Sequence, residues 1–269
     1  MLGTDVCAAA LGIGHELDAL PRRRADITDA AAVDAAVRAD GPDVVINCAA
    51  WTDVDGAESS PDAAMNVNAA GAANVARAAA TCGAWTIHVS TDYVFDGSKR
   101  EPYVESDPVA PLSQYGRSKL EGERTIAVEA PDSHTIVRSS WLFGVAGKCF
   151  PATILGLASR RDQLTVVADQ IGCPTFTGDL AAALLELAQM RVPGVLHVAA
   201  AGSCSWFEFS QEIVERAGLE CDLSPGKTAD LGRPAARPAY SVLGTERGAP
   251  RLPDWREGLG RYMSTYAHA

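Results

Sequence analysis

The sequence predicts an α/β fold in which a doubly wound parallel sheet is followed by a smaller C-terminal α+β domain. In the first half, strand-like apolar runs alternate with Ala-rich stretches, which is typical of a parallel sheet with helices on both faces. Beyond Gly144 the pattern changes to helices separated by short strands and by loops that contain Pro and Gly. We therefore predict two domains, residues 1–145 and 146–269, and the second can be interleaved with the first.

The individual elements follow from the same pattern, beginning with a helix directly after Met1. In the first half, the predicted strands are 15–20, 43–47, 85–90 and 135–138, and the predicted helices are 30–39, 61–81 and 112–129. In the second half, the predicted helices are 150–159, 178–190 and 205–217, the strands are 164–167 and 195–198, and 225–253 is mostly loop. Open α/β sheets bind ligands at the carboxyl ends of their strands, so we expect the site there.

Composition excludes several classes of protein. The chain has 269 residues and a formal net charge of -11, which argues against nucleic acid or an anionic membrane as a partner. Its seven cysteines are scattered and include no C-x-x-C pair, as expected in a reducing compartment. There is no signal-peptide pattern and no apolar run long enough to span a membrane, so we expect a cytoplasmic protein without a protein-bound metal site.

The first residues lack a feature that a dinucleotide-binding sheet should have. Such a Rossmann-like unit begins with an apolar strand and a turn of several glycines, which lets the pyrophosphate approach a helix N-terminus. Only the last glycine of such a turn is present, as Gly3, and the first strand is absent. Either translation starts upstream of Met1, or the chain is a truncated form or a pseudoenzyme, and we expect weak cofactor binding by the chain as given.

Other segments of the first half could still hold a dinucleotide. Small residues follow the strand 43–47 and would allow close approach of a cofactor, although this segment alone favours a strand end packed under a helix. Asp26 could bind an adenine amine or act as a helix N-cap. Arg22, Arg23 and Arg24 follow the strand 15–20 where an acidic residue would select NADH, so they favour NADPH or form a solvated basic loop.

The clearest chemical pattern joins a strand end to a helix face. Ser90 and Thr91 end the strand 85–90, and Tyr115 and Lys119 lie four positions apart on the helix 112–129, hence on one face. A neighbouring ammonium can lower the pKa of a phenol and bind a cofactor ribose, which makes the phenol a proton donor. The pattern predicts reduction of a carbonyl group by a nicotinamide.

In its order of motifs the chain resembles the dTDP-4-dehydrorhamnose reductases, a family of extended short-chain dehydrogenases/reductases. A lone Y-x-x-x-K is weak evidence, but here six motifs occur in the family's order across nearly the whole chain. The motifs stand at Ser90–Phe95, Tyr115 to Lys119, Arg138–Trp141, Asp169–Thr175, Ser203–Trp206 and Arg237–Leu243.

The resemblance implies roles for particular residues. Tyr115 would donate a proton to the C4 carbonyl oxygen, Lys119 would hold the nicotinamide ribose and depress the pKa of Tyr115, and Thr91 would bind the carbonyl oxygen. Asp92, Trp141 and Arg237 would contact the substrate, Arg237 at its diphosphate. The further cofactor contacts implied are Gly3, Asp26, Ile27, Ala49, Ala50, Thr52 and Val89, and Asn68 matches a family asparagine beside the active site.

The activity implied is NADPH-dependent reduction of dTDP-4-dehydro-L-rhamnose to dTDP-L-rhamnose, with NADH as the other cofactor. Two rivals stay open: another nucleotide-deoxysugar 4-ketoreductase of an antibiotic pathway, and a non-catalytic regulatory subunit of the same fold. Some family members use Mg²⁺ at a dimer contact, so the resemblance allows a homodimer. The chain shows no cluster of carboxylates that would require the metal, and the Mg²⁺ requirement is left undecided.

Overall fold

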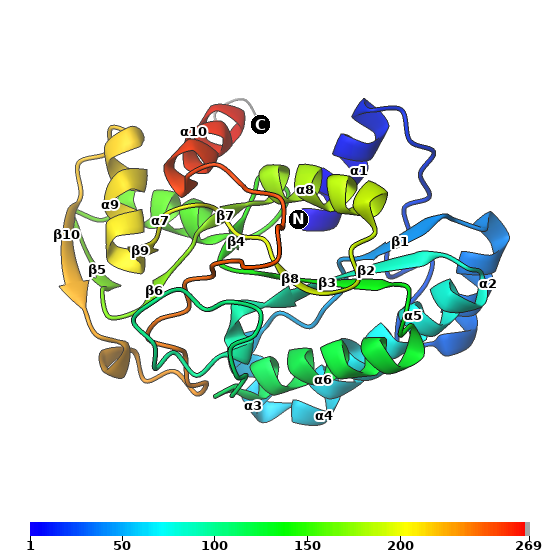
Figure 1. Ribbon diagram of the computed structural model, residues 1–269. Coiled ribbons are helices and arrows are strands. Elements are labelled where there is room, and N and C mark those ends of the chain that lie inside the picture. Colours follow the sequence, from blue (N-terminus) through cyan, green and yellow to red (C-terminus); the bar gives the residue numbers. More distant parts are fainter. Residues whose placement is uncertain (267–269) are drawn as a thin grey trace.

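A four-stranded parallel sheet forms the centre of the molecule in the computed structural model, which describes residues 1–266. Its strands run in the order β1-β2-β3-β8 (Figure 1). They are β1 (Val44–Asn47), β2 (Trp85–Thr91), β3 (His134–Ser139) and β8 (Gly194–His197). β3 is buried along its whole length, as expected for a strand covered on both faces.

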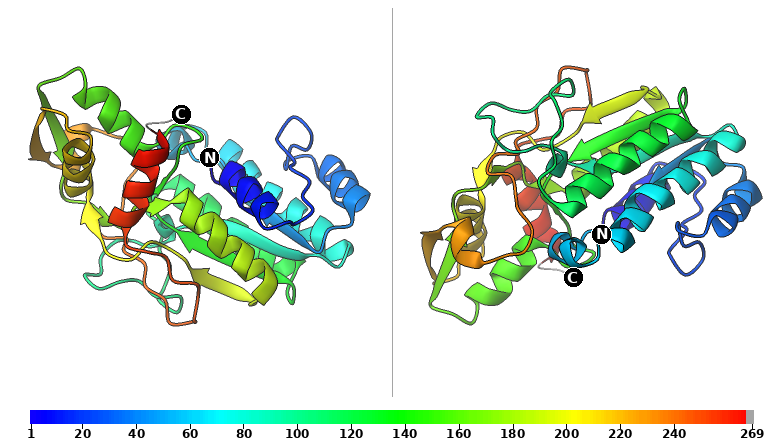
Figure 2. Two further views of the ribbon diagram at one scale, coloured as in Figure 1. Left: turned by 90° about the horizontal axis from the view of Figure 1, so that it is seen from above. Right: turned by 90° about the horizontal axis from the view of Figure 1, so that it is seen from below.

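Helices cover both faces of this sheet. One layer contains α1 (Leu2–Gly12) and α8 (Thr177–Met190), and the other contains α2 (Ala30–Asp40), α5 (Gly71–Thr81) and α6 (Gln114–Glu129) (Figures 1 and 2). Apolar side chains from α1 and α8 pack on Ile87 and Val137, and small ones from α5 pack with Ile126 on the opposite face. The Ala-rich helices can approach the sheet closely because their side chains are small.

The predicted helix 61–81 is continuous but changes its winding. It consists of α4 (Pro61–Met65), the π-helical turn η1 (Asn66–Ala70) and α5, and it follows the short helix α3 (Val54–Ser59). Single π turns inside helices occur frequently at functional sites. This turn contains the buried Asn68.

The remaining elements build a second, smaller core. Its helices are α7 (Phe150–Ala158), α9 (Trp206–Arg216) and α10 (Trp255–Tyr266). The strand β5 (Gln163–Val167) pairs in parallel with β10 (Asp222–Gly226), the strand β4 (Leu142–Phe143) with β7 (Thr175–Phe176), and β6 (Ile171–Gly172) runs antiparallel to β9 (Cys204–Ser205). Phe143, Phe209 and Trp255 lie at the centre of this core.

The chain returns to the first sheet after residue 145. β8 pairs with β3, and α8 packs on α1, so both belong to the first core although they follow the predicted boundary. The division into domains 1–145 and 146–269 stays a prediction. The loop predicted for 225–253 is confirmed apart from the end of β10 and the short helix η3 (Thr228–Leu231).

The strand predicted for residues 15–20 is wrong. This segment is exposed and irregular, and Arg24 hydrogen-bonds the carboxylate of Asp18 and the carbonyl oxygen of Ala19. A strand needs a neighbour to pair with, and among residues 1–266 no strand lies beside β1 on the edge away from β2. The other predicted strands and helices are present, with ends that differ by one or two residues.

Two general properties complete the description of the fold. All seven cysteines are free thiols. No helix among the described residues is both long enough and apolar enough to cross a bilayer.

Candidate active site

The candidate site lies where β2 ends and α6 begins. Ser113 caps α6 by accepting a hydrogen bond from the amide of Gly116. A Cβ at Gly116 would overlap the carbonyl oxygen of Tyr93, so glycine is needed for α6 to approach η2 (Asp92–Val94), the turn after β2. Tyr115 is consequently held beside Tyr93, with ring centroids 5.7 Å apart in an edge-on arrangement.

Tyr115 and Thr91 meet as the sequence predicts. Their side chains share a hydrogen bond that lowers the pKa of the phenol, but burial dominates and raises the pKa of Tyr115 to about 12. The Lys119 amine is engaged with Val89 and His88, and the expectation that its charge depresses the pKa of Tyr115 stays a prediction.

Lys119 is buried beneath Tyr115, one turn further along α6. Its Nζ donates a hydrogen bond to the carbonyl oxygen of Val89, 2.7 Å away, and lies 3.1 Å from Nε2 of His88. Burial lowers the pKa of Lys119 to about 8, partly opposed by the carboxylate of Glu123. An amine with a pKa so close to neutrality can gain or lose a proton during a reaction.

Asp92 brings a second unusual ionisable group to the site. It is 2% exposed, accepts a hydrogen bond from Thr91 at 3.2 Å, and its Oδ2 has no hydrogen-bond partner. Burial raises the pKa of Asp92 to about 7, and the hydroxyls of Ser241 and Thr91 act in the opposite direction. A buried carboxyl oxygen without a partner is able to accept a hydrogen bond from a ligand.

A buried ion pair fixes α6 to the sheet. Arg138 on β3 donates two hydrogen bonds to the carboxylate of Glu123, at 2.9 and 2.6 Å, and Ser90 donates a third at 2.5 Å. Glu123 follows Tyr115 and Lys119 at the same spacing of four residues, so it lies on the same helix face. That spacing is the signal for Glu123 in the sequence, although Glu123 was not among the predicted site residues.

Asn68 joins the π turn to the other parts of the site. Its Oδ1 accepts a hydrogen bond from the amide of Trp51, and its Nδ2 donates to the carbonyl oxygen of Trp51 and to the hydroxyl of Ser118. Ser118 in turn donates to the carbonyl oxygen of Tyr115. The segment after β1 and the helix that carries Tyr115 are thus held in register.

The residues expected to contact a dinucleotide lie along one edge of the sheet. Asn47 ends β1 opposite His88 of β2, so the segment with Ala49, Ala50 and Thr52 leaves the sheet beside Val89. Gly3, in the first turn of α1, faces Cys48 of this segment. Small side chains and an accessible backbone at adjacent strand ends fit a dinucleotide.

Asp26 and Ile27 lie on the loop before α2. Asp26 accepts hydrogen bonds from the amide and hydroxyl of Thr28 and pairs with Arg22, and these interactions lower its pKa to about 2. Ile27 packs against Gly71 of α5. Asp26 is thus an ionised acceptor at neutral pH rather than the N-cap of α2, a role that Asp29 fills.

Trp141 stands in a strained conformation supported from two sides. Its φ of 48° lies in the left-handed region that bulky residues rarely adopt. The ring stacks on Trp206 at 3.5 Å with an interplanar angle of 4°, and a Cβ at Gly172 would overlap it. Trp206 donates a hydrogen bond to Gln170. The predicted motifs around 141, 170 and 206 therefore converge on one aromatic platform.

Arg237 has a protein partner in this structure. Its guanidinium pairs with Asp55 of α3 at 2.8 Å and donates to the carbonyl oxygen of Ala235, and its side chain is 9% exposed. Arg233 approaches the same carboxylate at 3.5 Å. Asp55 was not predicted, because α3 is too short and too polar to give a periodic signal. The charges of both arginines reach Tyr93 and lower its pKa, although burial raises it overall.

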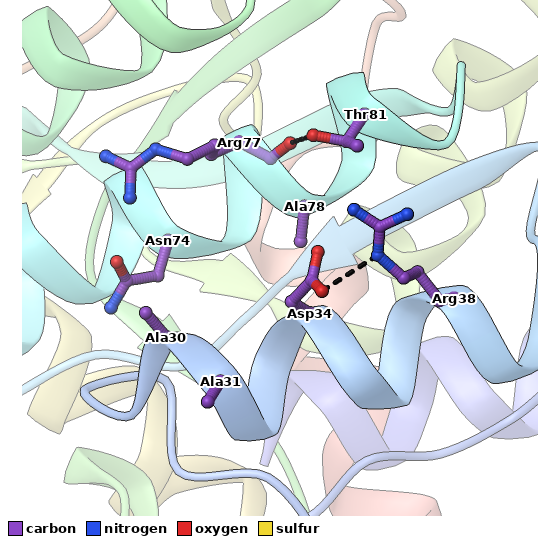
Figure 3. A pocket seen from close by; sticks show the side chains of 8 residues that line it. All are labelled: Ala30, Ala31, Asp34, Arg38, Asn74, Arg77, Ala78 and Thr81. Carbon is purple, nitrogen blue, oxygen red and sulfur yellow. Dashed lines mark hydrogen bonds and ion pairs between the residues drawn. The ribbon is translucent and has the colours of Figure 1, made fainter.

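The surface hollow drawn in Figure 3 is separate from these residues. It has a volume of about 350 Å³ and lies between α2 and α5. Its charged side chains have partners, since Arg38 pairs with Asp34 and Arg77 with Glu129. Within residues 1–266, no three His, Cys, Asp or Glu side chains gather in a way that could hold a metal ion.

A parallel sheet with a Tyr and Lys helix against a Thr at the neighbouring strand end defines an extended short-chain dehydrogenase/reductase, an oxidoreductase. The family model described as the RmlD substrate binding domain matches residues 1–268, and the chain belongs to this family.

Several relatives have been named or solved. The spore coat polysaccharide biosynthesis protein SpsK of Bacillus subtilis is 41% identical over 100% of this chain and 95% of its own length. The dTDP-4-dehydrorhamnose reductase of Mycobacterium tuberculosis is 42% identical over 100% of this chain and 91% of its length. The crystal structure of the Bacillus anthracis dTDP-4-dehydrorhamnose reductase with NADP is 37% identical, with a TM-score of 0.95 over 98% of this chain and 95% of that one.

Proposed function

We propose that this protein reduces the C4 ketone of dTDP-4-dehydro-L-rhamnose to the alcohol of dTDP-L-rhamnose, with NADPH as the reductant. The observation that carries the proposal is the pairing of Tyr115 with Thr91 above a buried Lys119. The family and the names of relatives that cover nearly the whole chain support the substrate.

The residues of the chain supply the acid half of the reaction. The reduced nicotinamide supplies a hydride to C4 when it is bound. Tyr115 gives the proton of its hydroxyl to the carbonyl oxygen, while Thr91 turns its hydroxyl from Asp92 to Tyr115 and donates a hydrogen bond that stabilises the phenolate left behind. Lys119 holds a ribose hydroxyl of the cofactor and, once protonated, stabilises the same phenolate by its charge.

We infer that substrate contacts surround this centre. The unpartnered Oδ2 of Asp92 accepts a hydrogen bond from a sugar hydroxyl, and the indole of Trp141 forms a wall for the sugar ring. Arg237 can bind the diphosphate only if its guanidinium leaves Asp55 and pairs with the diphosphate instead. The positive charge of Arg233 remains available beside it, with a side chain 53% exposed.

The preference for NADPH rests on the basic loop before Asp26. The side chain of Arg22 is 83% exposed and can pair with a 2′-phosphate without disturbing the core. Replacing Arg22 and Arg23 with Ala should raise the KM for NADPH several-fold and leave that for NADH unchanged. Equal effects on both cofactors would remove these arginines from cofactor selection.

Two measurements test the activity itself. Tyr115→Phe should lower kcat by about 10²- to 10⁴-fold, the usual contribution of a placed general acid. Tyr103→Phe is the control, because Tyr103 is also buried but donates its hydrogen bond to Asp96, outside the site. Near-normal turnover of Tyr115→Phe would refute the mechanism. Steady-state rates on a panel of dTDP-4-keto sugars test the substrate, and a higher kcat/KM on another member would refute that assignment.

A further inference from the structure

A buried histidine, which the proposed reaction does not use, contacts the catalytic lysine. His88 is 1% exposed and lies opposite Asn47, its register partner on β1, so both side chains point to the face covered by α6. Asn47 Nδ2 lies 3.1 Å from His88 Nδ1, and His88 Nε2 lies 3.1 Å from Lys119 Nζ. Both ring nitrogens are therefore committed to protein partners.

The backbone amide of Ala49 fixes which atoms donate and which accept in these hydrogen bonds. The amide of Ala49 lies 3.0 Å from the side chain of Asn47, and a backbone N–H can only donate. The atom of Asn47 that faces it must then be the oxygen, so the NH₂ group faces His88. Nδ1 of His88 has to accept this hydrogen bond, and the ring proton of a neutral imidazole is left on Nε2.

The same logic continues to Lys119. A proton on Nε2 of His88 points at Nζ, which must accept it through a lone pair, and only a neutral amine has one. The neutral amine can still donate to the carbonyl oxygen of Val89. An ammonium or an imidazolium would place two donors face to face, either between Lys119 and His88 or between His88 and Asn47. Turning the Asn47 amide over would only move that conflict to Ala49.

We propose that His88, held by Asn47 in the Nε2–H form, favours the neutral amine of Lys119 in the free protein and so sets the pH above which Lys119 lacks the proton that the reaction requires. His88 is a positioning residue in this scheme, because it acts through Lys119 and not on the substrate.

The other groups around Lys119 are compatible with this proposal. On its own helix, Tyr115 and Glu123 face it, and the Glu123 charge raises the pKa of Lys119. From the segment after β1, Cys48 faces it as a neutral thiol, because burial raises the pKa of that thiol to about 12. Burial lowers the pKa of His88 well below its usual value, and the Lys119 charge acts in the same direction. Neither His88 nor Cys48 thus carries a charge that would compensate an ammonium at neutral pH.

The first experiment measures the tautomer in the free protein. Nitrogen-15 NMR of the histidine rings distinguishes Nε2–H, Nδ1–H and the imidazolium, and the His88 signals are assigned by their loss in His88→Gln. We expect Nε2–H at about pH 9, above the pKa of about 8 at which Lys119 loses its proton. Finding Nδ1–H or the imidazolium would overturn the proposal. No substrate is present, so failure of the proposed sugar-reducing function would leave this result unaffected.

The second experiment follows Lys119 itself. The chain has four lysines, so carbon-13 labelling of their side chains gives four signals, and Lys119→Arg identifies the one from Lys119. We expect this signal to titrate near pH 8. If the Lys119 signal still has the chemical shift of an ammonium at about pH 10, close to the unperturbed pKa of lysine, the proposal is overturned.

The third experiment tests the consequence for catalysis, which rests on the proposed function. Asn47→Asp presents only acceptors to both Ala49 and His88, so the ring proton moves to Nδ1 and Nε2 accepts from a Lys119 ammonium. The alkaline limit of kcat/KM should then rise by about one pH unit, a tenfold change in proton affinity for about 1.4 kcal/mol. Asn66→Asp, on the exposed side of η1, adds the same charge and should leave the limit unchanged. If His88 in Asn47→Asp changes its tautomer but the alkaline limit of kcat/KM does not move, control of Lys119 by His88 is refuted.

Discussion

Asp92→Asn removes a carboxyl group whose ionisation the folded protein resists. Burial raises the pKa of Asp92 from 3.8 to about 7. The pKa of Asp92 is higher in the folded protein than in the unfolded chain. Below pH 3.8 the group therefore leaves the free energy of unfolding unchanged. Between pH 3.8 and 7 it lowers this free energy progressively, and above pH 7 the loss is constant. Three pKa units correspond to about 4 kcal/mol of unfolding free energy in alkaline solution.

The isosteric amide has no such dependence, so the difference between variant and wild type should change with pH. Between pH 5 and pH 7 the free energy of unfolding of Asp92→Asn should rise relative to wild type by about 2 kcal/mol. In a chain of this size, that corresponds to a relative shift in Tm of about 4–8 °C. Thermal unfolding, followed by circular dichroism in steps of about one pH unit from pH 5 to pH 8, measures this shift in Tm.

A control of opposite sign comes from Asp96. Hydrogen bonds from Ser98 and Tyr103 lower its pKa, so Asp96 contributes stability that is lost as the pH falls. Asp96→Asn should therefore lose stability relative to wild type as the pH rises through 3.8, and the difference should stay constant from pH 5 to 8. A difference between Asp92→Asn and wild type that stays constant from pH 5 to 8, as expected for Asp96→Asn, or that falls as the pH rises, would refute the reasoning about Asp92.

Two further predictions concern the buried ion pair and the aromatic stack. Arg138→Met should lower the free energy of unfolding in urea by about 3–5 kcal/mol, because it leaves Glu123 buried without its partner, and adding Glu123→Leu should recover most of the loss. If the double variant is as unstable as the single one, the unpaired charge is not the cause. Trp206→Leu should raise the substrate KM by about 2- to 10-fold, since a stacked aromatic pair contributes about 0.5–1.5 kcal/mol to the placement of Trp141. The KM for NADPH is the internal control, and an equal rise in both constants would contradict a local role.

The helix that carries Tyr115 and Lys119 was predictable because its information is local. Tyr115, Lys119 and Glu123 are spaced by four residues, and such spacing places side chains on one helix face wherever the helix packs. The start of α9 is local in the same way, since Ser205 and Glu208 form a capping box. These features depend on neighbours within one turn of a helix.

Other features depend on partners far away in the sequence. The segment 15–20 was predicted to be a strand, but pairing decides whether a strand forms, and the described sheet ends at β1. Arg237 was expected at a diphosphate, yet Asp55 from α3, 182 residues away in sequence, accepts its hydrogen bond. The short helix α3 and the Gly-containing α10 gave no periodic signal and were missed.

The sequence by itself determined the alternation of strands and helices, the family and the Tyr115, Lys119 and Thr91 centre, because each follows from local spacing or from an ordered set of motifs. Only the tertiary structure decided the protonation states within that centre. The pKa values of Tyr115, Lys119 and Asp92 depend on burial and on the hydrogen bonds of groups such as His88 from other strands. Desolvation is a property of the whole packed molecule, and no pattern along the chain reports it.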